Sequence, residues 1–165
     1  MYIAKYWGDY IGGTDDSLTL TAYLAAKGRQ TISLEEIFAD FGAETLFGDF
    51  RNTDPPLVFT NAEGWDMEMD CAIDLISDLA ALLLECKVNE RVDLLEVDDT
   101  LELDPSDSKI QITATPRELE QVNKILADFA ASPLEYDIGQ VDTEESVWEL
   151  AAVCEALRRE LYGSA

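Results

Sequence analysis

One segment of the sequence, residues 7–17, joins residue types that suit the binding of a basic surface. It reads WGDYIGGTDDS, so two aromatic side chains stand among three carboxylates and three glycines. Aromatic side chains supply much of the binding energy at protein interfaces, and carboxylates pair with arginine or lysine. The same segment also fits a purely structural role as a strand end, a glycine turn and a helix cap. The candidate contact residues in this segment are Asp9, Tyr10, Asp15 and Asp16.

A second candidate group lies in the most acidic part of the chain. Residues 63–107 contain 15 acidic and 2 basic residues, which is more than half of the net charge of −24. Most of these acids fall in two tracts, residues 63–70 and 93–107. A solvated surface that aids solubility is the simplest interpretation, but a mixture of both charges would also dissolve, and self-repulsion destabilises the folded chain. The candidate contact residues in the second tract are Asp98, Asp99, Glu102 and Asp104.

The composition argues against catalytic and metal-binding chemistry. The chain has no histidine, which removes the usual general base at neutral pH, the Ser-His and Cys-His nucleophile pairs and histidine-containing metal sites. The glycines near residue 12 are not followed by the Lys-Ser/Thr of a phosphate loop, and residues 98–107 lack the residue order of an EF-hand. Paired carboxylates serve glycoside hydrolysis, but among 35 acids some pair always exists. We therefore expect no enzyme activity, no cofactor and no metal or catalytic site.

The cysteines and the apolar runs indicate a cytoplasmic protein. Cys71, Cys86 and Cys154 are odd in number and widely spaced in apolar surroundings, which predicts buried, reduced thiols. Residues 1–6 lack the pattern of a signal peptide. The longest apolar run, residues 79–84, is far too short to span a membrane.

The pattern of secondary structure predicts a single α+β domain over residues 1–165, with an antiparallel or mixed sheet and helices packed against it. Capping residues, glycines and prolines mark the ends of the helices. The expected helices run from Asp16 or Ser17 to Gly28, from Ser33 to Gly42, over residues 71–86, from Thr115 to Pro133 and from Thr143 to Gly163. The expected strands are residues 2–7, 57–60, 92–97, and 101–104 with 109–113 as a hairpin.

Residues 71–86 carry the broadest apolar stripe and predict the central buried helix. Asp70 precedes that stripe and Asp74, Asp78 and Glu85 interrupt it, and we expect all four on the solvent side of the helix.

The sign of the charge limits the partners. A polyanion repels nucleic acid and anionic membranes, so neither is expected to bind directly. It attracts a basic protein, and the field accelerates their encounter. Nuclease active sites are cationic because they hold phosphates, so a nuclease is a suitable partner.

Residues 7–17, together with the size and acidity of the chain, resemble the opening of a family of immunity proteins from bacterial polymorphic toxin and contact-dependent inhibition systems. These are small, acidic, cytoplasmic α+β proteins, and the resemblance implies tight binding and neutralisation of a cognate toxin domain. It does not identify contact residues. The hypothesis is therefore an immunity protein that covers a basic toxin with its carboxylates, with a nuclease as the favoured toxin class. The alternative is a nucleic-acid mimic that inhibits a DNA-binding host protein, which would need carboxylates spaced like phosphates along an elongated face.

Overall fold

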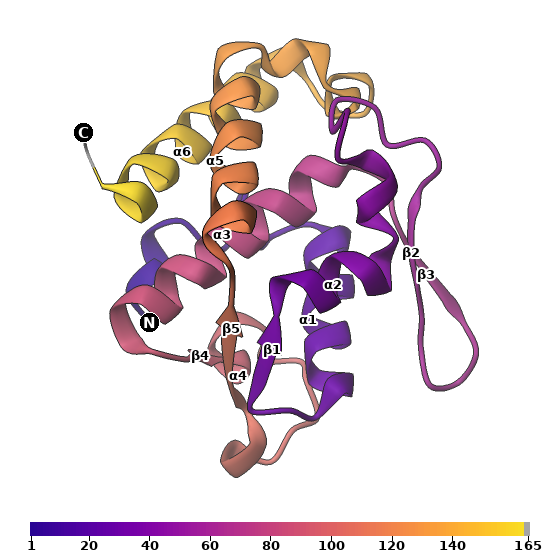
Figure 1. The fold of residues 1–165 in the computed structure, drawn as a ribbon, viewed down its shortest axis with the longest axis vertical. Coiled ribbons are helices and arrows are strands. Elements are labelled where there is room, and N and C mark those ends of the chain that lie inside the picture. Colours follow the sequence, from indigo (N-terminus) through magenta and orange to yellow (C-terminus); the bar gives the residue numbers. More distant parts are fainter. Residues whose placement is uncertain (164–165) are drawn as a thin grey trace.

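The computed structural model describes residues 1–163. Within that range the chain forms six α-helices and five short strands, connected by 3-10 turns (Figure 1). The helices are α1 (Asp15–Lys27), α2 (Leu34–Phe41), α3 (Ala72–Asn89), α4 (Leu94–Val97), α5 (Pro116–Ala131) and α6 (Glu144–Tyr162). The strands are β1 (Thr31–Ser33), β2 (Leu57–Thr60), β3 (Asp66–Met69), β4 (Val92–Asp93) and β5 (Lys109–Thr113). The 3-10 turns are η1 (Tyr2–Lys5), η2 (Ala43–Leu46), η3 (Pro105–Asp107), η4 (Pro133–Glu135) and η5 (Asp137–Gln140). The predicted α+β class is confirmed.

The helix ends follow from local capping chemistry. Ser33, Thr115 and Thr143 each accept a hydrogen bond from a backbone N–H in the first turn of the helix they precede, as predicted. Gly28 adopts the left-handed conformation (φ +59°) that ends α1. The predicted cap of α1 was wrong by a few residues, because Thr14 has the extended backbone of an N-cap and Ser17 lies inside the helix.

Helix α3 crosses the middle of the molecule and is covered on all sides (Figure 1). It packs against α1, α5, α6, η1, β4 and β5. Every side chain from residue 72 to residue 85 is buried. The central helix is therefore confirmed, but the expectation that Asp74, Asp78 and Glu85 face solvent was wrong, since a helix covered all round has no solvent side.

The strands form two separate sheets. One sheet has the order β1-β5-β4, with β1 parallel and β4 antiparallel to β5, so it is mixed. The other is the antiparallel hairpin of β2 and β3. The predicted hairpin of residues 101–104 with 109–113 was wrong: β5 pairs instead with β1 and β4, which are distant in sequence, and residues 101–104 form no strand.

Two further predicted strands, residues 2–7 and 92–97, are not strands over most of their length. Residues 2–5 form the 3-10 turn η1, and only Trp7 makes an isolated bridge, to Ile11. Of residues 92–97, only the first two are strand, because Asp93 caps the short helix α4. In the described chain no helix is long and apolar enough to cross a membrane.

The three cysteines are unpaired thiols. Cys71 and Cys154 are buried, as predicted, and Cys86 is half-buried. Burial raises the pKa of the Cys71 and Cys154 thiols well above the ordinary value, and nearby aspartates raise it further.

Candidate protein-binding surface

The loop between η1 and α1 is closed by backbone contacts and by one aromatic ring. The N–H of Gly8 donates to the carbonyl of Ile11 at 2.7 Å, and Ile11 is fully buried. The indole of Trp7 covers Gly12, which has a φ of +79° and no room for a Cβ because that atom would overlap the ring. The loop is therefore built around Trp7 and Gly12. Asp9 is exposed, whereas Tyr10 is half-buried and packs against the core.

Buried carboxylates of α3 hold the backbone of this N-terminal segment. Asp78 accepts a hydrogen bond from the N–H of Gly12 at 2.9 Å, and Glu85 accepts one from the N–H of Ile3 at 3.0 Å. Burial raises the pKa of Asp78 to about 7. A buried N–H without an acceptor would be costly, so these acids replace the solvent that the segment loses.

Asp16 joins the same buried group from the first turn of α1. Its two carboxylate oxygens accept hydrogen bonds from the N–H groups of Asp70 and Cys71, both at 3.3 Å. The carboxyls of Asp16 and Asp74 interact inside the fold, and the pKa of each is raised, chiefly by burial. The pKa of Asp74 rises to about 9, so this carboxyl is protonated at neutral pH.

The second acidic tract lies directly beside the first loop. The indole N–H of Trp7 donates to the carbonyl of Val97 at 3.0 Å, and the hydroxyl of Thr21 donates to Asp98 at 2.7 Å. Asp98 also accepts from the N–H and the hydroxyl of Thr100, and these hydrogen bonds lower its pKa despite burial. The fold thus brings together two sequence segments that are about 80 residues apart.

The structure places the eight candidate residues in three settings. Five are exposed and available to a partner: Asp9, Asp15, Asp99, Glu102 and Asp104. Tyr10 is half-buried. Asp16 and Asp98 are 7% and 8% exposed and are committed to internal hydrogen bonds, so their role in this fold is to hold the surface in shape. Asp104 has a structural contact as well, because it accepts from Ser106 at the start of η3.

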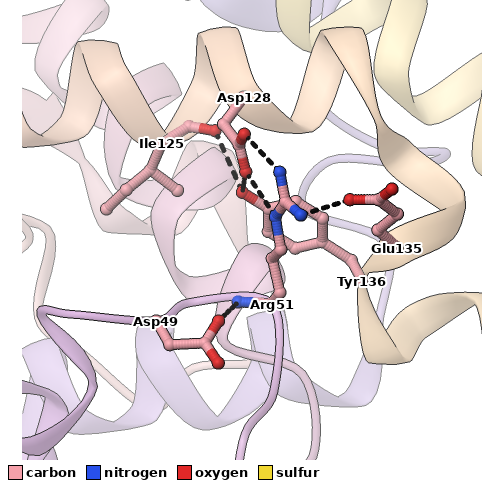
Figure 2. Close-up of polar contacts among 6 residues, drawn as sticks. All are labelled: Asp49, Arg51, Ile125, Asp128, Glu135 and Tyr136. Atoms are coloured by element: carbon pink, nitrogen blue, oxygen red, sulfur yellow. Dashed lines mark hydrogen bonds and ion pairs between the residues drawn. The ribbon is translucent and has the colours of Figure 1, made fainter.

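The cations of the molecule are mostly engaged elsewhere. Figure 2 shows the guanidinium of Arg51 between Asp128 and Glu135, and it forms an ion pair with each. Its Nη2 and Nε donate to the two carboxylate oxygens of Asp128 at 2.7 and 2.9 Å. This pairing raises the pKa of Arg51 and lowers that of Asp128. Arg158 and Arg159 share Glu155, whose pKa falls to about 2.

The acids of residues 63–107 are left without such partners. Within residues 1–163, the one ion pair in that segment joins Glu96 to the amino group of Met1. The basic side chains nearest to the second tract, Arg91 and Lys109, line a shallow hollow with Asp93 and Glu96 but make no ion pair within 4 Å. The negative charge of the candidate surface is therefore open to an outside partner.

An exposed aromatic residue lies outside both candidate groups. Trp65, at the tip of the β2–β3 hairpin, is 69% exposed. It stands within the acidic tract of residues 63–70, so the combination of an aromatic and carboxylates that singled out the first loop was also present here.

The comparisons with known proteins give one match. A family model described as immunity protein 68 (Imm68) matches residues 2–161. No curated protein and no solved structure matches the chain.

Proposed function

The chain belongs to the immunity protein 68 family, and from that premise we propose that it binds a cognate basic toxin domain and neutralises it through its acidic surface. The family match supports the immunity role and a toxin as partner. Basicity of the toxin is inferred from the charge of this chain, −24 over 165 residues.

The proposal rests on exposed carboxylates of the first loop and of the second acidic tract that form no ion pair within the described fold. Asp9 and Asp15 on the first loop, and Asp99 and Glu102 beside it, are exposed carboxylates without an internal cation among the described residues. Exposed charges of this kind steer a cationic partner and speed its encounter, while aromatic side chains such as Tyr10 add buried contact area.

A nuclease is the toxin class that best suits this surface. A groove that holds the phosphates of nucleic acid must present arginine and lysine, and a carboxylate surface complements it. The proposed mechanism is occlusion, by covering either the active site or a neighbouring exosite. It needs no catalytic step and no cofactor of the immunity protein, and it operates in the cytoplasm, where such a toxin would find its substrate.

The direct test is protection from the neighbouring toxin. The chain is co-expressed with the product of the gene immediately upstream in cells that the product kills. We expect survival and co-purification of the two proteins. Death of the cells without any complex would show that the assignment to this toxin is wrong.

A further inference from the structure

The hairpin of β2 and β3 is the most prominent projection of the fold. Figure 1 shows it extending beyond the helices on one side of the molecule. Its turn carries Trp65, which is the most exposed aromatic residue of the described chain. An indole in that position contributes nothing to the core and offers a large apolar surface to a partner.

The turn holds Trp65 in a defined place. Asn61 accepts hydrogen bonds on its side-chain oxygen from the N–H groups of Glu63 and Trp65, at 3.0 and 2.9 Å. The backbone of Asn61 also pairs with the carbonyl of Trp65 at 2.9 Å, and Gly64 supplies the positive φ that the turn requires. A pre-formed turn loses little conformational entropy when it binds.

The base of the hairpin is anchored without help from its tip. Leu57 and Met69 are buried, and Phe59 contacts the rings of Tyr23 and Phe41. Asp16 accepts from the N–H groups that follow β3, so the hairpin is also connected to the first loop. A change at Trp65 therefore leaves the packing of the hairpin intact.

Three exposed carboxylates neighbour Trp65 along the turn and β3. Glu63, Asp66 and Glu68 are all exposed, and none makes an ion pair in the described chain. The side chain of Asp66 accepts from Thr60 at 2.7 Å, which fixes its position. An exposed indole on a hairpin that also carries these anions suits an apolar pocket rimmed by arginine or lysine, with ion pairs and cation–π contacts around it. A second copy of this chain, or an anionic membrane, would be repelled.

We infer that this hairpin tip, Glu63, Trp65, Asp66 and Glu68, is a principal docking element for the toxin domain, with Trp65 as its buried anchor. The inference rests on the proposed function and adds to the surface formed by the first loop and the second tract. The partner it fits is a cationic protein surface with an apolar pocket.

The test measures the dissociation constant of the purified chain with a catalytically inactivated form of the toxin domain encoded upstream. Trp65→Ala is expected to weaken binding at least thirtyfold, about 2 kcal/mol. A triple variant, Glu63→Gln with Asp66→Asn and Glu68→Gln, is expected to slow association at least fivefold.

The chain offers matched controls for both changes. Trp148 on α6 is also exposed (46%) and stands among Glu144, Glu145 and Glu149. Trp148→Ala, and a triple variant of those glutamates to glutamine, change the same residue type and the same net charge. We expect both to bind within threefold of the unsubstituted chain, and all variants to keep its circular dichroism spectrum and urea midpoint.

The outcomes separate the inference from the proposed function. If the unsubstituted chain binds and Trp65→Ala binds equally well, the docking role of the hairpin is wrong and the immunity function stands. If Trp148→Ala weakens binding as much, the contact is not specific to the hairpin. If Trp65→Ala changes the oligomeric state in sedimentation, the tip is a contact between copies. If the unsubstituted chain neither binds nor protects, both proposals fail.

Discussion

The indole N–H of Trp7 donates a hydrogen bond to the backbone carbonyl of Val97, 3.0 Å away and 90 residues further along the chain. This contact places the first loop directly beside the second acidic tract. It brings together two segments that the sequence shows only as separate candidates.

Replacing Trp7 should therefore loosen the contact between these two segments. Trp7→Phe keeps an aromatic ring but removes the donor, so the carbonyl of Val97 loses its partner. We expect a loss of about 1–2 kcal/mol in the free energy of unfolding, measured by urea denaturation. Trp148→Phe, at an exposed site, is the control and should change it by less than about 0.5 kcal/mol. Equal stability of Trp7→Phe and the unsubstituted chain would contradict the structural role of this bond.

The buried Asp16–Asp74 pair predicts a loss of stability at alkaline pH. The pKa of Asp74 is about 9 in the folded chain, far above the ordinary value of 3.8, so folding retains a proton that the unfolded chain has released. The folded state is therefore least stable at alkaline pH, where the folded chain must release this proton as well. Between about pH 5 and pH 9 this proton should lower the free energy of unfolding by up to about 1.4 kcal/mol per pH unit, and Asp78, with its pKa raised to about 7, should add to the fall below pH 7.

Asp74→Asn tests the assignment of this slope. The amide has nearly the shape of the carboxyl and cannot ionise, so the variant should show a flatter pH dependence and exceed the unsubstituted chain in stability at pH 8 by at least about 1 kcal/mol. Asp99→Asn removes an exposed acid and should leave the slope unchanged. The measurement is urea denaturation at intervals of one pH unit, and parallel curves for Asp74→Asn and the unsubstituted chain would exclude the pair as the source.

Arg51 fastens the segment that precedes β2 to α5. Arg51→Lys keeps the charge but loses the two-pronged contact with Asp128, since an ammonium group cannot present parallel N–H donors. We expect amide exchange in residues 47–54 to accelerate roughly tenfold in native conditions, with little change in α3. Arg29→Lys, at an exposed pair with Glu36, is the control and should leave exchange unchanged. Uniform exchange rates in the Arg51 variant would show that the segment is held by other contacts.

Salt should slow the formation of the toxin complex. Raising the ionic strength from about 0.01 M to about 1 M shortens the screening length from about 30 Å to about 3 Å. We expect the association rate to fall by more than about tenfold, and the dissociation rate to change far less. Asp99→Asn with Glu102→Gln should lower the rate at low salt by roughly threefold, whereas Glu120→Gln with Glu149→Gln, which removes equal charge elsewhere, should change it by less than twofold. A salt-independent rate in stopped-flow mixing would indicate an apolar interface.

The helices could be predicted from the sequence because their ends are local. Thr115 with Glu118 forms a reciprocal capping box, and Gly42 ends α2 in a left-handed conformation, and both signals lie within a few residues of the ends they mark. The class of the fold followed from the same elements, mixed with short β-like runs.

The pairing of the strands and the fate of the buried acids could not be predicted in that way. Lys109–Thr113 pairs with strands about 80 and 17 residues earlier in the chain, and no local pattern identifies those partners. Asp78 and Glu85 have the sequence signature of solvent-facing acids on an amphipathic helix. Their burial depends on the N–H groups of Gly12 and Ile3, which are brought to them only by the tertiary fold. For the same reason Asp16 and Asp98 could not be distinguished from their exposed neighbours.

Asp78 and Glu85 hold the N-terminal segment through its main-chain N–H groups and not through its side chains. These contacts therefore do not depend on which side chains the first loop exposes. These N–H groups belong to Ile3 and Gly12, so the exposed Asp9 and Asp15 can be exchanged without releasing either hydrogen bond. The exposed side chains of the loop can then change while its backbone keeps the same conformation. An immunity protein built in this way can adapt to a changing toxin at little risk to its own folding.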